Sequence, residues 1–195
     1  MSQIHEQLHE WSQKAPQFLW LGEGATGDWV TVADGARLVQ NYEATLAEFG
    51  IEPGQRVLLG VTRPIRFALL WLALLDLGAV AVPIDSLAPM SERVRIAGQI
   101  SASWVVADES AASADFGAGI VMVDDKGYLS LLRSAIVKAE RYAGGGVVLF
   151  TSGSTGEPKP VGLPLAALWQ AAKRVAAVAT ALCPYSTSMP RWWES

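Results

Sequence analysis

The sequence is poor in the residues that disulfide frameworks, thiolate metal sites and polyanion-binding surfaces require. Its 195 residues contain one cysteine, Cys183, which excludes an intrachain disulfide and a site with several thiolate ligands. Fifteen basic residues against nineteen acidic ones give a formal net charge of −4, which argues against nucleic acid as a partner. A hydrophobic content of 51% excludes an intrinsically disordered chain. We therefore expect one buried core in a cytoplasmic protein, since a reducing compartment suits a chain without disulfides.

The chain also lacks a segment with the features of a membrane span. The first ten residues are polar and do not contain the basic and apolar regions of a secretion signal. The longest apolar stretch covers residues 67–84, but Asp76 interrupts it and Gly78 is typical of a helix end. We expect a buried helix followed by a short strand before Pro83, and no membrane span.

Helix-like and strand-like patterns alternate along the chain. Apolar residues at helical spacing predict an N-terminal helix that ends before Pro16, and two apolar runs around residues 22–27 predict a hairpin. Further helices are expected over 32–49, 64–77, 91–101, 128–138 and 164–182, and strands over 56–61, 80–82, 104–107, 120–123 and 147–151. Because these strands are continuous apolar runs separated by helices, they predict an α/β fold with a mainly parallel sheet and helices on both faces.

Residues 147–160, VVLFTSGSTGEPKP, carry the strongest functional signal. An apolar strand leads into a turn of glycine, serine and threonine, and Lys159 follows. Glycine lets backbone N–H groups approach anionic oxygens, hydroxyls add donors, and the lysine adds positive charge. The spacing is not that of a Walker loop, because Pro160 stands where serine or threonine should follow the lysine. The residue types favour a polyphosphate site, although their composition alone is equally typical of a flexible polar turn.

This stretch resembles the phosphate-loop signature of the adenylate-forming (AMP-binding) superfamily, which contains acyl- and aryl-CoA synthetases and nonribosomal-peptide adenylation domains. Segments over 31–57, 72–85 and 89–108 also resemble family segments, in the same order. The resemblance runs from about residue 4 to about residue 180 and implies the N-terminal part of an AMP-binding-domain fold. It separates a domain over 1–182 from an unmatched tail over 183–195.

The resemblance also implies roles for the loop. The residues that it places around the β- and γ-phosphates of ATP are Thr151, Ser152, Gly153, Ser154, Thr155, Gly156 and Lys159. Lys159 is the catalytic candidate, because together with Ser154 and Thr155 it would hold pyrophosphate as it leaves. The implied reaction is attack of a substrate carboxylate on the α-phosphorus of ATP in the presence of Mg²⁺. This reaction gives an acyl-adenylate and pyrophosphate, and in many members the acyl group then passes to a thiol of CoA or of a carrier protein.

The sequence departs from the family pattern in several places. Members are more than twice as long, and their adenine-contacting segment, magnesium-binding Tyr-Gly-x-Thr-Glu motif, ribose-binding aspartate and C-terminal lysine are not found here. Pro160 replaces the usual glycine after the loop lysine, and Pro164-Leu165 stands where many members have a Ser/Thr-His pair. We therefore expect a piece of an acid ligase that is inactive alone. The alternative is a non-catalytic scaffold or interaction module. Either would leave an apolar face bare, so we expect a homodimer, a complementing chain or poor solubility.

A second motif, His5-Glu6-Gln7-Leu8-His9, satisfies the H-E-x-x-H zinc pattern. The chain has no other histidine, so a third ligand would be a distant carboxylate such as Glu23 or Glu43. An amphipathic helix explains the segment without a metal. A small metallopeptidase is therefore a remote alternative, and no metal site is expected.

The remaining candidate residues favour structural roles. Asp85 and the pair Asp124-Asp125 are typical turn residues. Asp76 is expected to be hydrogen-bonded or to lie at a rim, and Cys183 is expected to be an inert thiol. The paired tryptophans of the tail, Trp192-Trp193, either dock on the body or a partner or belong to a frayed end.

Overall fold

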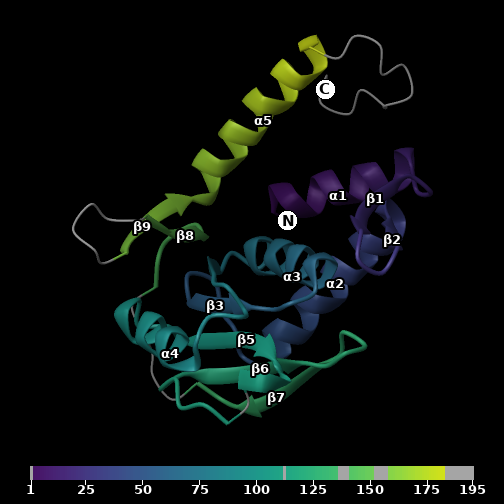
Figure 1. Cartoon of the computed structure of the whole chain (residues 1–195). Helices are drawn as coiled ribbons and strands as arrows, with labels where there is room; N and C mark the ends of the chain where they lie inside the picture. The colour runs from purple at the N-terminus through teal and green to yellow at the C-terminus, as the bar shows by residue number, and fades with distance from the viewer. Residues whose placement is uncertain (1, 112, 136–140, 152–157, 183–195) are drawn as a thin grey trace.

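The computed structural model of the chain describes residues 2–111, 113–135, 141–151 and 158–182 (Figure 1). Its helices are α1 (Gln3–Lys14), α2 (Val32–Glu48), α3 (Pro64–Asp76), α4 (Met90–Gln99), the 3₁₀ turn η1 (Glu109–Ala111) and α5 (Leu165–Leu182). Its strands are β1 (Leu19–Glu23), β2 (Asp28–Thr31), β3 (Arg56–Gly60), β4 (Val80–Pro83), β5 (Trp104–Asp108), β6 (Gly119–Val123), β7 (Leu129–Arg133), β8 (Gly146–Thr151) and β9 (Lys159–Pro164).

Seven strands form the central sheet, in the order β7-β6-β5-β3-β4-β8-β9. The five inner strands run parallel to one another, whereas the edge strands β7 and β9 are antiparallel to β6 and β8. The remaining two strands, β1 and β2, pair as a separate antiparallel hairpin. The predicted α/β fold with a mainly parallel sheet is therefore confirmed, and so is the hairpin.

Helices cover both faces of the sheet, as the apolar strands predicted. On one face, α2 and α3 pack with α1 over Val57, Leu59 and Val106. On the other face, Ile96 and Ile100 from the α4 region pack over alternate residues of the same strands. Because successive side chains of a strand point to opposite faces, β3 contributes to both clusters and is buried on both sides.

Local signals set several helix boundaries. Thr31 Oγ1 accepts a hydrogen bond from Asp34 N at 3.1 Å and caps α2, while Pro64 occupies the first turn of α3. Gly78, with φ of +78°, follows the end of α3 and turns the chain into β4. The apolar stretch over 67–84 is thus a helix and a strand. Among the described residues, no helix combines the length and hydrophobicity that crossing a membrane requires.

The helix expected over 128–138 is wrong, because Leu129–Arg133 form strand β7. The tight turn before it reverses the chain: Gly127 has φ of +88°, and its N–H bonds the carbonyl of Asp124 at 2.9 Å. Tyr42 Oη donates to Gly127 O at 3.0 Å and anchors this turn to α2. The leucines of the segment suited a helix, but pairing with β6 decides its conformation. Residues 136–140 lie outside the described part.

Strand β9 was not predicted. Its prolines Pro160 and Pro164 disfavour a central strand, because proline cannot donate a backbone hydrogen bond. The structure places β9 at the sheet edge, paired with β8 from Gly146↔Pro164 to Thr151↔Lys159. Proline is tolerated at such an edge, so the strand forms and the helix predicted from residue 164 begins at Leu165.

Candidate functional site

The two ends of the predicted phosphate loop lie side by side at the end of the β8–β9 hairpin. Thr151 is the last residue of β8 and Lys159 the first of β9, and they are register partners. Thr151 Oγ1 donates to Lys159 O at 3.4 Å. The loop residues Ser152, Gly153, Ser154, Thr155 and Gly156 lie outside the described residues. The loop therefore leaves the sheet at the carboxyl end of a parallel strand, the edge at which open α/β sheets bind ligands.

The base of the loop is held from a second side, and its lysine is open to solvent. Gln99 Nε2, at the end of α4, donates to Pro158 O at 3.4 Å. The side chain of Lys159 is exposed, and it forms no ion pair within the described ranges. A cation in this position is available to an anion, and apolar packing does not enclose it.

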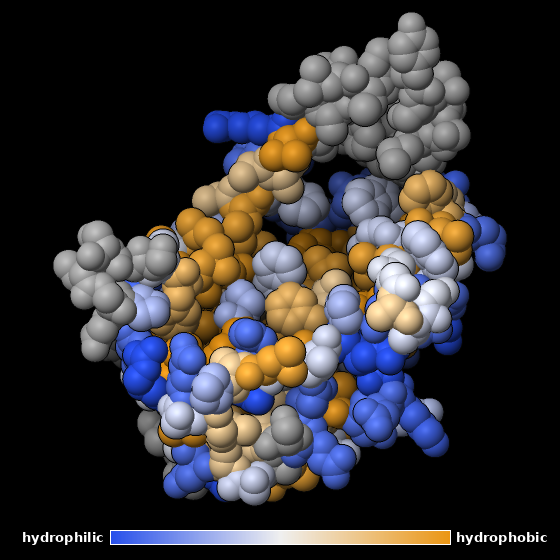
Figure 2. Space-filling model, in the orientation of Figure 1, coloured by the Kyte–Doolittle hydropathy of each residue, from blue (hydrophilic) through white to orange (hydrophobic). Residues whose placement is uncertain are grey.

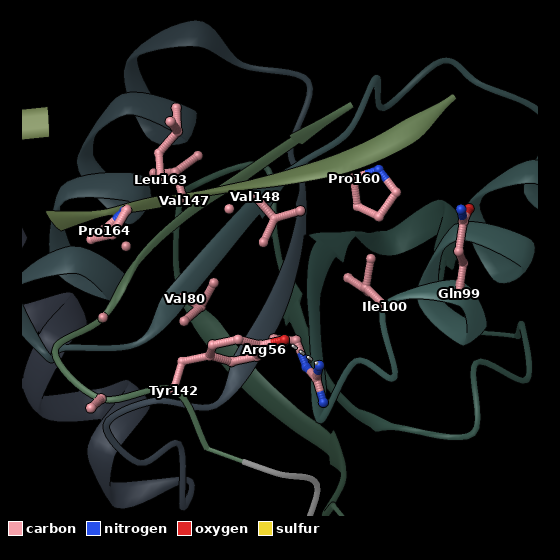
Figure 3. A pocket seen from close by; sticks show the side chains of 14 residues that line it. Arg56, Val80, Gln99, Ile100, Tyr142, Val147, Val148, Pro160, Leu163 and Pro164 are labelled. Atoms are coloured by element: carbon pink, nitrogen blue, oxygen red, sulfur yellow. Dashed lines mark hydrogen bonds between the residues drawn. The ribbon is translucent and has the colours of Figure 1, made fainter. Parts of the chain in front are cut away.

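A cavity of about 440 Å³ lies beneath the same hairpin (Figure 3). It forms because β8 pairs with β4 over only two residue pairs, Val80↔Gly146 and Ala81↔Val147. Apolar side chains, including Ile100, surround most of it. Its polar end is the guanidinium of Arg56, which lies 5.1 Å from the ring centroid of Tyr142. Arg56 and Val80 begin β3 and β4 and line one end of the cavity, whereas Gln99 and Pro160 line it near the base of the phosphate loop.

Comparison with known proteins decides the family. The AMP-binding enzyme family matches residues 6–191. The chain belongs to this family. The family match passes residue 182, and a domain boundary at that residue stays a prediction, as does a separate tail over 183–195.

Curated relatives of this chain are much longer than it is. An L-proline–[L-prolyl-carrier protein] ligase from Pseudomonas fluorescens is 33% identical over 140 residues, which cover 64% of this chain and 28% of the ligase. The hybrid PKS-NRPS synthetase thnA from Trichoderma harzianum is 28% identical over 139 residues, which cover 70% of this chain and 3% of the synthetase. The chain thus spans only a fraction of the length of the curated relatives it matches.

Solved structures share the fold of this chain. The N-terminal domain of FACL13 from Mycobacterium tuberculosis superposes with a TM-score of 0.64 at 23% identity, covering 84% of this chain and 44% of that one. Apo MatB from Rhodopseudomonas palustris gives a TM-score of 0.65 at 21% identity, covering 93% of this chain and 37% of that one. At these identities the likeness shows the fold alone. The predicted N-terminal part of an AMP-binding-domain fold is confirmed.

Asp85 and Asp124, which the sequence assigned to turns, have that role in the structure. Asp85 Oδ1 accepts from Leu87 N at 2.8 Å. Asp124 Oδ1 accepts from Tyr128 N and from Lys126 N, both at 2.8 Å. These backbone donors, with the Tyr128 N–H foremost, hold the pKa of Asp124 below its usual value, because they stabilise the ionised carboxylate.

The H-E-x-x-H residues are not brought together as a zinc pair. His9 is exposed, whereas His5 faces Asp76 with 3.7 Å between His5 Nδ1 and Asp76 Oδ2. Among the described residues, the group that brings three ligand-type side chains together is His5, Glu43 and Asp76, from three helices. Sequence spacing indicated Glu43 as a distant carboxylate but missed Asp76, because the separation of helices in space is not encoded in any local pattern. Cys183 lies outside the described residues.

Proposed function

We propose that this chain is the N-terminal part of an AMP-forming acid ligase and that residues 151–159 bind the β- and γ-phosphates of ATP. The observation that carries the proposal is Lys159, which is exposed at the carboxyl edge of the sheet, forms no ion pair with the described residues, and has Thr151 directly opposite it. A positive charge and hydroxyl donors at that edge suit a polyphosphate. The membership in the AMP-binding family supports the same assignment.

In the proposed reaction, a carboxylate oxygen of the substrate attacks the α-phosphorus of ATP. The bond between the α-phosphorus and the bridging oxygen breaks, and pyrophosphate leaves with the bonding electrons. Lys159 and the loop hydroxyls would stabilise the negative charge that develops on this leaving group. Mg²⁺ would neutralise part of the phosphate charge. The resemblance assigns its protein ligand to a glutamate motif that this sequence does not contain, so this chain would supply the lysine and hydroxyl contacts.

The relatives favour a thiol as acceptor of the acyl group. The names of the curated relatives refer to a prolyl-carrier protein and to nonribosomal peptide synthesis, whereas one similar structure is a fatty acyl CoA synthetase. We infer a thioester-forming ligase, with a carrier-protein thiol favoured over CoA by the curated relatives.

Calorimetry with ATP and with pyrophosphate tests the loop. We expect Lys159→Ala to weaken binding about tenfold or more, because a charge-assisted contact to phosphate contributes about 1.5–3 kcal/mol. Lys173→Ala is the matched control, since Lys173 is an exposed lysine on α5 away from the loop, and it should bind like the unaltered chain. Equal binding by both variants, or no binding by the unaltered chain, would overturn the phosphate role and favour the scaffold alternative.

A second measurement separates binding from catalysis. We expect the 195-residue chain to show no carboxylate-dependent exchange between ATP and pyrophosphate, because the motifs that the resemblance assigns to adenine, ribose and magnesium are not found in it. Exchange above the level of Lys159→Ala would show that the chain is a complete enzyme.

A further inference from the structure

Three helices bring titratable side chains together apart from the phosphate loop. His5 lies on α1, Glu43 on α2, and Asp76 at the end of α3. One ligand-type atom of each lies within 4.8 Å of those of the other two. Figure 1 shows α1 lying against α2 and α3, on the opposite side of α3 from the sheet. The three residues therefore join the N-terminal helix to the body of the protein.

Asp76 is the most buried member of the group, and one of its oxygens lacks a hydrogen bond. Its side chain is 2% exposed. Oδ1 accepts a hydrogen bond from Ser2 Oγ, whereas Oδ2 is buried with no hydrogen-bond partner among the described residues. Oδ2 instead points toward His5 Nδ1, 3.7 Å away. A buried polar atom without a hydrogen bond is costly, so we take this oxygen as evidence for a ligand that is not part of the chain.

The charge of the group is also unbalanced. Two carboxylates share one imidazole, which carries at most one positive charge. A divalent cation would compensate both carboxylates at once and would use the free oxygen of Asp76.

We propose that His5, Glu43 and Asp76 bind a divalent transition-metal ion of the zinc type, which fastens α1 to α2 and α3. One imidazole nitrogen and two carboxylate oxygens form a borderline ligand set that suits Zn²⁺, whereas Mg²⁺ prefers oxygen ligands and retains water. Bonds of about 2.0–2.2 Å at tetrahedral angles place ligand atoms about 3.3–3.6 Å apart, so closure from separations within 4.8 Å requires side-chain shifts of up to about 1 Å. Ser2, through its hydrogen bond to Oδ1, orients the Asp76 carboxylate.

This site differs from the H-E-x-x-H pattern in a way that an experiment can separate. Both possible zinc sites use His5. The H-E-x-x-H site also needs His9, which is exposed and is not part of the three-residue group. The two histidines are one helical turn apart on α1, so His9→Gln is a closely matched control for His5→Gln. Glu43→Gln is a second test variant, chosen because Glu43 is less buried than Asp76 and its substitution perturbs the core less.

The test uses a tag-free, chelator-treated chain carrying Cys183→Ser, so that no thiol or added histidine competes. We expect calorimetry to show one Zn²⁺ per chain and a Zn²⁺-dependent rise in Tm, with no rise from Mg²⁺ at the same concentration. His5→Gln and Glu43→Gln should each weaken Zn²⁺ binding about tenfold or more and remove the rise, while His9→Gln should retain both.

Two results would overturn the proposal. One is a parent chain that binds no Zn²⁺ more tightly than His5→Gln does, which would leave the group as a polar contact between helices. The other is equal loss of binding in His9→Gln and His5→Gln, which would assign the metal to the sequence motif instead. Neither result depends on ATP or pyrophosphate binding, so failure here is distinguishable from failure of the proposed function.

Discussion

The inner strands of the central sheet and the β8–β9 hairpin at its edge are buried to very different extents. In β3, the residues Val57, Leu58 and Leu59 are at most 1% exposed, because α2, α3 and α4 cover both faces. In β8, burial is complete only at Gly146 and Val147 and then alternates, and Leu149 is 41% exposed. Its partner on β9, Val161, is 42% exposed. The inner strands thus find their apolar cover within this chain, whereas the β8–β9 hairpin finds only part of it.

The exposed part of the hairpin is continuous with apolar surface on α5. Figure 2 shows hydrophobic residues gathered along α5 and the hairpin. The first turns of α5 do contact the core through Leu165, Leu168 and Trp169, but Val175 further along is 69% exposed. Contiguous exposed apolar surface of this kind is typical of protein interaction sites. The difference between the two regions leads to three predictions.

The largest expected effect is on stability in the inner region. Leu70 in α3 has no exposed surface, so Leu70→Ala should lower the free energy of unfolding by about 3 kcal/mol through lost burial and the cavity left behind. Val161→Ala in β9 should cost less than about 1 kcal/mol, because much of that side chain already contacts water. Chemical denaturation of both variants measures the difference. Equal losses would contradict the contrast between the regions.

The second prediction concerns association through the exposed hairpin. As an edge strand with an apolar face, β9 should support dimerisation that increases with concentration. Val161→Lys should weaken this association about tenfold, since a charge opposes both burial and edge pairing. Light scattering after size-exclusion chromatography measures it. Leu87→Lys is the control, because Leu87 is 80% exposed on the loop after β4. An unaltered chain that remains monomeric at every concentration would refute the prediction.

The smallest effect is a pH dependence at the opposite edge of the sheet. The backbone donors lower the pKa of Asp124 in the folded protein. Its ionised form therefore stabilises the β6–β7 turn fully at pH values above the usual carboxyl pKa of about 3.9. That contribution is lost as pH falls through the lowered folded pKa. Asp124→Asn should therefore make the free energy of unfolding depend less on pH on the acid side, below the usual carboxyl pKa of about 3.9. Asp125→Asn, at the next residue, should keep the profile, since its side chain accepts neither of these bonds. Identical profiles would refute the role of the turn.

Local sequence signals predicted most of the fold. The cap at Thr31, the proline at position 64 and the apolar runs of the inner strands each act over a few residues, so they identify elements reliably. The errors fall at both sheet edges. There, β7 and β9 form because a neighbouring strand supplies hydrogen bonds. In β7 this pairing overrides the helical spacing of the leucines, and in β9 it overrides the prolines that disfavour a strand.

The order of apolar and polar residues was enough to determine the α/β class, the inner parallel strands, and the position of the loop between Thr151 and Lys159. The segments that resemble the AMP-binding family can also be read from the sequence alone. Only the tertiary structure decided that His5 meets Glu43 and Asp76, that His9 does not, and that β8 separates from β4 beneath the hairpin. The physical reason is distance along the chain: contacts between residues tens of positions apart depend on how whole helices and strands pack, and no short pattern records that packing.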